Sequence, residues 1–123
     1  MAVTRRLSDS EQTQLLARMR SVLDDHARRG QTLTYLELAD AVAMPGPQRI
    51  HRATRLLERL MKEDAETGRP LRSALVVSRV GNGLPAAGFF DRARRLGLFD
   101  GEDPSAFHRQ QLLGLASGKD DSL

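Results

Sequence analysis

Hydrophobic positions recur at helical spacing from about residue 8 to residue 29. Their spacings of three, four and seven are typical of one buried helix face. The face consists of Leu15, Leu16, Met19, Val22, Leu23 and Ala27. Ser8 and Glu11 have the spacing of a capping box, and Gly30 stands where a C-terminal cap belongs. The pattern therefore predicts a first helix over residues 8–29.

Two more helices are expected before residue 68. Thr34 and Glu37 form a second capping-box pattern, which begins a short helix with an apolar inner face. Residues 44–47, Met-Pro-Gly-Pro, end it. Pro47 suits the first turn of the next helix, because the N–H that proline lacks would be unpaired there anyway. This third helix is predicted to run to about Glu63.

The pattern then changes from helix to strand. Residues 73–80 form an apolar run that predicts a buried strand, and residues 81–83, Gly-Asn-Gly, predict a turn. Residues 84–88 are expected to form a short return arm, which Pro85 confines to a sheet edge. Two short helices should follow. The first covers residues 89–96, and the second opens with Asp103 and Pro104 and directs Phe107, Leu112 and Leu113 toward the core.

This order of elements predicts the fold class. A mainly α domain with a small β hairpin, in a winged helix-turn-helix-like arrangement, would explain a short helix, a turn and a third helix followed by a strand and a glycine turn. The length of 123 residues suits one domain. We expect this domain to span residues 8–117, with flexible ends at residues 1–7 and 118–123.

The third helix carries two opposed stripes. At about 100° per residue, its apolar and basic positions fall within separate arcs on nearly opposite sides. The apolar stripe, expected to be buried, is Ile50, Ala53, Leu57 and Leu60. The basic stripe, expected to be exposed, is Arg52, Arg55, Arg59 and Lys62, with Arg49 beside it. A row of cations on one helix matches what a nucleic-acid backbone or a major groove accepts.

Charge is unevenly distributed along the chain. The net charge is only +3, but residues 49–95 hold eleven basic and five acidic residues. This basic middle favours contact with a polyanion. Arg79, just before the glycine turn, would assist at the tip of a wing. A protein partner, or a basic face that is merely solvated, would fit the same pattern.

Composition argues against an enzyme. The chain has no cysteine, which excludes disulfides, thiolate zinc sites and cysteine nucleophiles. Its three histidines, His26, His51 and His108, fall on different predicted helices without metal-ligand spacing. The acidic run Glu63-Asp64-x-Glu66 is interpreted as solvated acid. We therefore expect no catalytic residues, no cofactor, no metal and no small-molecule ligand.

The layout also resembles a known DNA-binding domain. Thr34-Tyr35-x-x-Leu38-Ala39, then Pro45, an Arg-bearing helix, Pro70 and a Val-rich strand ending at a glycine turn resemble the DNA-binding domain of the alkyltransferase and alkyltransferase-like family. The resemblance covers roughly residues 32–88 and implies a winged helix that binds DNA. The family's Pro-Cys/Trp-His-Arg-Val signature is not met, because Leu71, Arg72 and Ser73 follow Pro70, so alkyl transfer is excluded.

A second resemblance adds no activity. Residues 73–77, with Gly83-Leu84-Pro85 and Gly88-Phe89-Phe90, are similar to small bacterial domains without a known activity. The residues thus predict a cytoplasmic, non-catalytic DNA-binding domain without a membrane partner. The alternative is a protein-interaction module or a homodimer on the same scaffold, since winged-helix folds serve both roles.

Overall fold

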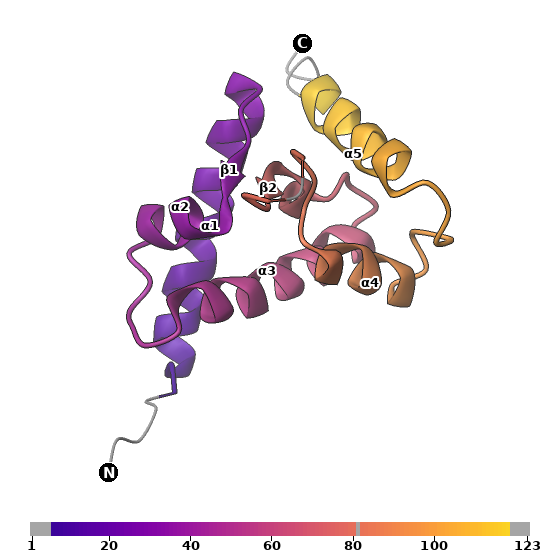
Figure 1. Cartoon of the computed structure of the whole chain (residues 1–123). Helices are drawn as coiled ribbons and strands as arrows, with labels where there is room; N and C mark the ends of the chain where they lie inside the picture. The colour runs from indigo at the N-terminus through magenta and orange to yellow at the C-terminus, as the bar shows by residue number, and fades with distance from the viewer. Residues whose placement is uncertain (1–5, 81, 119–123) are drawn as a thin grey trace.

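The computed structural model describes residues 6–80 and 82–118, which form a mainly helical fold with one small sheet. The elements in chain order are α1 (Asp9–Arg29), β1 (Leu33–Thr34), α2 (Tyr35–Ala41), α3 (Arg49–Glu66), η1 (Arg72–Leu75), β2 (Val76–Val77), α4 (Ala87–Arg95) and α5 (Pro104–Gly118). Helix α3 runs across the molecule from α1 and α2 at one end to α4 at the other (Figure 1). Most of the predicted flexible ends, residues 1–5 and 119–123, lie outside the described residues.

The predicted caps of the first two helices are confirmed. The Ser8 hydroxyl accepts a hydrogen bond from the backbone N–H of Glu11, and the Glu11 carboxylate accepts one from the N–H of Ser8. Thr34 and Glu37 repeat this exchange at the start of α2. Gly30 ends α1 in the left-handed conformation that glycine adopts most readily. These signals act within four residues, so the sequence alone specifies both helix starts.

The predicted strand over residues 73–80 is wrong for most of its length. Residues 72–75 form the 3₁₀ helix η1, and only β2 is extended. The backbone there bonds to distant side chains instead of a neighbouring strand. Gln111 accepts from the N–H of Leu71, and the carbonyl of Ala74 bonds to His108 Nε2 at 2.8 Å.

The small sheet is a parallel pair and not the predicted hairpin. Leu33 pairs with Val76 and Thr34 with Val77, so β2 joins the strand that precedes α2. Beyond β2, the N–H of Ser78 donates to the carbonyl of Leu84 at 2.8 Å, but residues 82–86 form no strand. The predicted turn includes Gly81, which lies outside the described residues.

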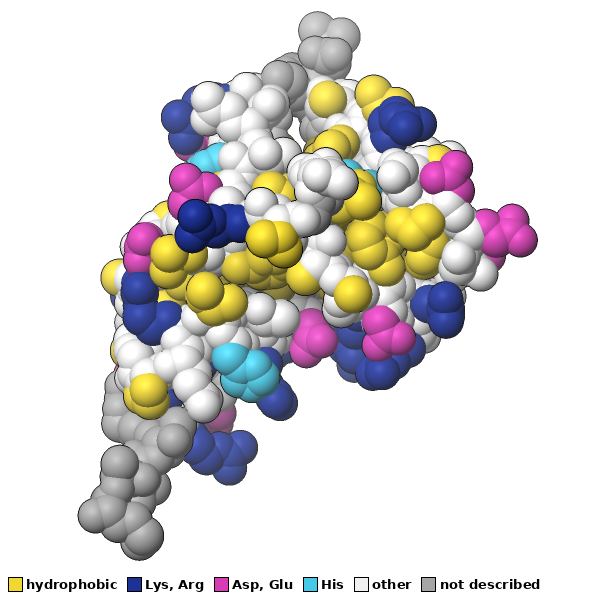
Figure 2. Space-filling model, viewed as in Figure 1, with side chains coloured by type: hydrophobic (Ala, Val, Ile, Leu, Met, Phe, Trp, Pro, Cys, Tyr) yellow, Lys and Arg dark blue, Asp and Glu magenta, His cyan; other side chains and the backbone are white. Residues whose placement is uncertain are grey.

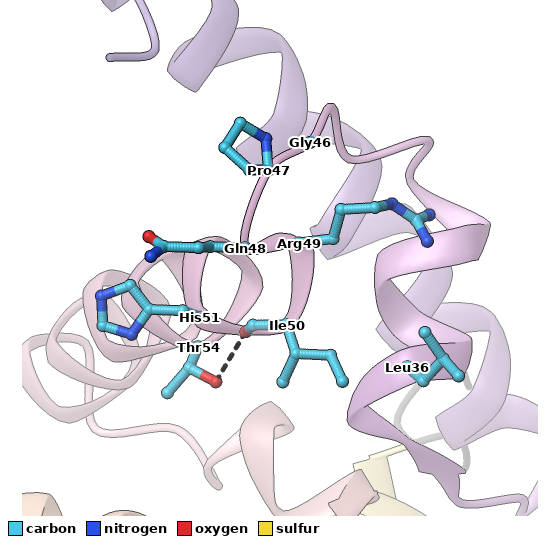
Figure 3. A pocket seen from close by; sticks show the side chains of 8 residues that line it. All are labelled: Leu36, Gly46, Pro47, Gln48, Arg49, Ile50, His51 and Thr54. Atoms are coloured by element: carbon cyan, nitrogen blue, oxygen red, sulfur yellow. Dashed lines mark hydrogen bonds between the residues drawn. The ribbon is translucent and has the colours of Figure 1, made fainter. Parts of the chain in front are cut away.

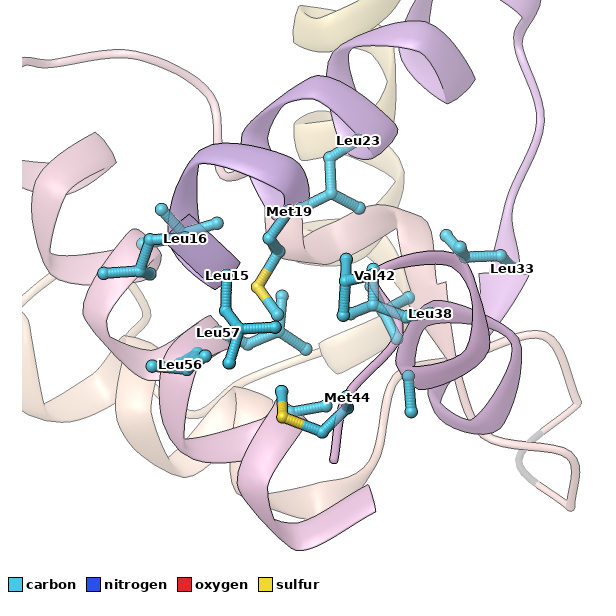
Figure 4. Packing of buried hydrophobic residues seen from close by; sticks show 14 of the residues in the cluster. Leu15, Leu16, Met19, Leu23, Leu33, Leu38, Val42, Met44, Leu56 and Leu57 are labelled. Atoms are coloured by element: carbon cyan, nitrogen blue, oxygen red, sulfur yellow. The ribbon is translucent and has the colours of Figure 1, made fainter. Parts of the chain in front are cut away.

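Two hydrophobic clusters form the core. The larger one lies between α1, α2, α3 and β2, and includes Leu15, Met19, Leu23, Leu38, Val42 and Leu57 (Figure 4). The smaller one joins the end of α3 to α4 and α5, and includes Met61, Leu71, Phe89, Phe99 and Phe107. Leu112 and Leu115 of α5 pack against both clusters. Leu113, predicted to face the core, is 61% exposed, because the inward face of α5 passes through residues 112 and 115 instead.

Helix α5 approaches the preceding loop closely. A Cβ atom placed on Gly114 would lie 2.8 Å from Cγ of Pro70. Glycine therefore lets the α5 backbone pack directly on the proline ring. The predicted start of this helix is confirmed, since the Asp103 carboxylate accepts from the N–H of Ala106 at 3.1 Å.

A buried ion network lies between the end of α3, η1 and α1. Asp64 is completely buried, and the guanidinium of Arg72 bonds to it. Asp24 and Glu63 flank the same guanidinium at 3.5 and 3.4 Å, and Glu63 also pairs with Arg20. The interpretation of the acidic run as solvated is therefore wrong for Asp64. In the described ranges, no helix is long and apolar enough to cross a membrane.

Candidate nucleic-acid interface

Helix α3 starts later than its sequence suggests. It begins at Arg49, and Pro47, predicted in its first turn, lies before it. Gln48 precedes the helix in a left-handed conformation (φ 58°) and makes no side-chain cap. The first turn contains no acidic residue. No carboxylate of the first turn therefore compensates the partial positive charge that the helix dipole places at this N-terminus.

Arg52, predicted on the exposed basic face, is buried instead. It is only 8% exposed, and its Nη1 donates to the carbonyl of Pro45 at 3.0 Å. The loop before α3 folds over this side chain. The guanidinium group therefore donates hydrogen bonds to carbonyl groups of the loop. Ile50, predicted to be buried, is 46% exposed. The first turn of α3 thus shows an apolar residue where a basic one was expected.

The other predicted cations are in different settings. Arg49 is half-buried and bound by Asp40 at 2.7 Å and by the carbonyl of Met44 at 2.8 Å. Arg55, Arg59 and Lys62 are exposed, as predicted. Arg79 is exposed after β2.

A groove along one side of α3 collects half of these cations. We call it the cationic groove. It has a volume of about 640 Å³ and is lined by Arg6, Leu7, Gln12, Gln48, His51, Arg52, Arg55, Leu56, Glu58, Arg59 and Arg92. The N-terminal part of the chain forms one wall, and α4 contributes Arg92. Lys62 and Arg79 do not line it, nor does Arg49.

The groove has an excess of positive charge. It contains five arginines and one acidic residue, Glu58. Within the described residues, Arg6, Arg55, Arg59 and Arg92 form no ion pair; Arg59 donates to the neutral amide of Gln12 at 2.8 Å. Seven arginines elsewhere are paired with acids, namely Arg20, Arg28, Arg29, Arg49, Arg69, Arg72 and Arg95. Arg18, Arg79, Arg94 and Arg109 form no ion pair with a residue that the structure describes, but they are not among the groove residues.

Arg92 differs from the other groove cations. Its Nε atom is buried and has no hydrogen-bond partner among the residues that the structure describes. A buried donor without a partner costs about 1–3 kcal/mol. An anion in the groove would provide acceptors for the guanidinium group of Arg92.

The sequence did not indicate Arg6, Gln12 or Arg92 as members of this site. They come from the segment before α1, from α1 and from α4, and tertiary packing brings them beside α3. No spacing along the chain relates them. The high arginine content of residues 49–95 was the only signal that included Arg92.

An apolar hollow adjoins the cationic groove. It is shallow, with a volume of about 910 Å³, and is lined by Leu36, Gly46, Pro47, Gln48, Arg49, Ile50, His51 and Thr54. Figure 3 shows Ile50 between Leu36 of α2 on one side and Thr54 on the other. Hydrophobic side chains also gather on the surface over α2 and the start of α3 in Figure 2. Gln48 and His51 line both depressions, so the two are adjacent.

The histidines have three separate roles. His26 bonds to the carbonyl of Val22 within α1, His108 is buried against Ala74 and Phe89, and His51 is exposed. Across residues 6–80 and 82–118, no group of three or more His, Asp or Glu side chains is placed to hold a metal ion. Comparison with protein-family models, with curated proteins and with solved structures finds no match to this chain.

Proposed function

We propose that this chain is a cytoplasmic, non-catalytic domain that binds nucleic acid, DNA in the first place, through the cationic groove. One observation carries the proposal: four guanidinium groups, those of Arg6, Arg55, Arg59 and Arg92, meet in one groove without an acidic partner among the described residues. Seven arginines outside the groove pair with acids, and the unpaired ones there do not meet in one depression with the groove residues. The groove is therefore a surface with a net positive field.

Phosphate is the anion that suits this surface. A guanidinium group presents a planar fork that bonds two phosphate oxygens at once. Arg55 and Arg59 are four residues apart on α3, about 6 Å along the axis, so they can contact successive groups of a polyanion. Binding of this kind releases counterions and weakens steeply as salt rises. Without sequence-specific contacts, we expect a Kd of about 10⁻⁴ to 10⁻⁶ M at physiological salt.

A winged-helix-like arrangement remains part of the proposal. The order α1, β1, α2, α3 and β2 supports it, as does the packing of α2 on α3. The segment after β2, which carries the exposed Arg79, would take the place of a wing. In this view Arg79 is an outlying contact, and Lys62 continues the basic face of α3 beyond the groove.

Fluorescence anisotropy with a labelled random-sequence oligonucleotide tests the proposal. The Arg55→Glu variant should weaken binding at low salt by about tenfold or more, because it removes one phosphate contact and adds a repulsive charge. Arg109→Glu is the matched control, since Arg109 is exposed on α5, away from the groove. Lys62→Glu should have an intermediate effect.

Two results would overturn the proposal. Equal losses in Arg55→Glu and Arg109→Glu would mean that only the total charge matters and not the groove. No binding by the unmodified chain at about 50 mM salt, where nonspecific contacts are strong, would exclude the function itself. The far-ultraviolet circular dichroism of each variant should match that of the unmodified chain.

A further inference from the structure

We propose that the apolar hollow receives a nucleobase of a single strand whose phosphates lie in the cationic groove. The chain would then prefer single-stranded nucleic acid to duplex. This inference rests on the proposed function and specifies the form of nucleic acid that the site binds.

The two depressions are adjacent. Gln48 and His51 line both, and they stand at the start of α3, between Ile50 on one side and Arg52 and Arg55 on the other. A ligand that fills the apolar hollow therefore lies directly beside the arginines.

The hollow exposes two large apolar side chains. Ile50 is 46% exposed and Leu36 is 39% exposed, and the Pro47 ring lies beside them. Covering such surface removes it from water, which favours a ligand with a flat apolar face. The neighbouring guanidinium groups require the same ligand to carry anions.

A single nucleic-acid strand satisfies both requirements. Its phosphates are anionic, and its unstacked bases offer free faces. In a duplex, by contrast, the bases are stacked inside and present only their edges. Gln48 and His51 add hydrogen-bonding side chains where the two depressions meet, which suits contact with a base edge.

The shape of the site also favours a strand. A helix that reads duplex DNA enters the major groove and must project from the protein. Here the cations of α3 line a recess, with Arg6, Leu7 and Gln12 on one wall and Arg92 of α4 contributing to the lining. A recess can accommodate one flexible backbone more readily than a rigid duplex.

The test compares three labelled probes by fluorescence anisotropy: a short thymidine oligonucleotide, an abasic strand of equal length, and a duplex. The Ile50→Ser variant should weaken binding of the thymidine strand by about fivefold or more, because it removes apolar surface that the base would cover, at about 25 cal/mol per Å². It should leave the abasic strand unchanged, since that probe has only phosphates and sugars. Leu113→Ser is the matched control, because Leu113 is exposed on α5.

The unmodified chain should bind the thymidine strand more tightly than the abasic strand and the duplex. Tighter binding of the duplex, or equal effects of Ile50→Ser on the thymidine and abasic strands, would overturn the inference. So would light scattering that shows a dimer which Ile50→Ser converts to a monomer, since a second copy would then cover the hollow.

The Arg55→Glu variant separates this inference from the proposed function. It should weaken binding of all three probes, because each carries phosphates. If Arg55→Glu acts and Ile50→Ser does not, the cationic groove binds nucleic acid but the hollow takes no base. If no probe binds at low salt, the proposed function and the inference fail together.

Discussion

Nη2 of Arg72 lies 2.8 Å from Oδ1 of Asp64, and the backbone N–H of Arg72 donates to Oδ2 of the same carboxylate at 3.0 Å. Both residues are almost completely excluded from solvent. The Asp64 carboxylate thus holds both the side chain and the backbone of the residue that begins η1. This contact fixes the end of α3 to the segment that leads into β2.

Removal of the Asp64 charge should therefore be strongly destabilising. We expect Asp64→Asn to lower the free energy of unfolding by about 3–5 kcal/mol, because it leaves the buried Arg72 without its main counter-charge. Chemical denaturation measures this change. Asp91→Asn is the control, since it breaks only an exposed pair with Arg95, worth about 0.3–0.5 kcal/mol on a helix. Similar losses in the two variants would contradict the role given to Asp64.

Glu63 should contribute to the pH dependence of stability. The hydrogen bond from Arg20, at 2.8 Å, lowers the pKa of the Glu63 carboxyl below its ordinary value. A lowered pKa in the folded state gives stability that is present above the unfolded pKa, about 4.3, and is lost as pH falls through the folded pKa. The difference in unfolding free energy between the unmodified chain and Glu63→Gln should therefore shrink in acid. A difference that stays constant from neutral to acidic pH would refute this.

Replacement of Ser73 should stabilise the fold, whereas most substitutions in a core destabilise it. The Ser73 hydroxyl is buried, lines a cavity of about 20 Å³ and makes no hydrogen bond to any residue that the structure describes. Since an unpaired buried polar group is unfavourable, Ser73→Ala should raise the free energy of unfolding by about 1 kcal/mol. Ser21→Ala, at an exposed position of α1, should change it little. A destabilised Ser73→Ala variant would show that the hydroxyl contributes to the fold.

Substitution of Arg52 should affect mainly the stability of the fold, and substitution of Arg55 should affect mainly nucleic-acid binding. Arg52→Ala removes a buried donor to the Pro45 carbonyl and should cost about 1.5–3 kcal/mol, the range for hydrogen bonds to charged groups. Arg55→Ala removes an exposed side chain and should weaken nucleic-acid binding without a measurable loss of stability. Thermal denaturation and anisotropy on the same two proteins decide this. Loss of stability in Arg55→Ala, with none in Arg52→Ala, would reverse the assignment.

The starts of α1, α2 and α5 and the end of α1 could be predicted because their signals are local. The Ser8–Glu11 and Thr34–Glu37 boxes need only four consecutive residues, and Asp103 caps α5 in the same way. The end of α1 at Gly30 follows from backbone conformation alone. In each case the partners are fixed before any tertiary packing forms.

The segment around residue 73 and the first turn of α3 depend on distant contacts instead. An apolar run looks like a strand, but Gln111 and His108, far along the chain, bond to its backbone. Helical periodicity predicts Arg52 on the face of α3 opposite the core. The loop of residues 42–48 covers this part of the face and buries the Arg52 side chain. The groove was found only in part for the same reason, because Arg6 and Arg92 reach it through packing.

Gly114 makes the attachment of α5 depend on a single missing methyl group. Glycine within a helix costs roughly 0.5–1 kcal/mol relative to alanine, which by itself would favour alanine at this position. The ring of Pro70 occupies the space that a methyl group would need, so alanine would push α5 away from the loop before η1. Leu112 and Leu115, which bridge the two hydrophobic clusters, would move with it. Alanine, although it favours helix formation, would thus loosen the packing of α5 between the two hydrophobic clusters.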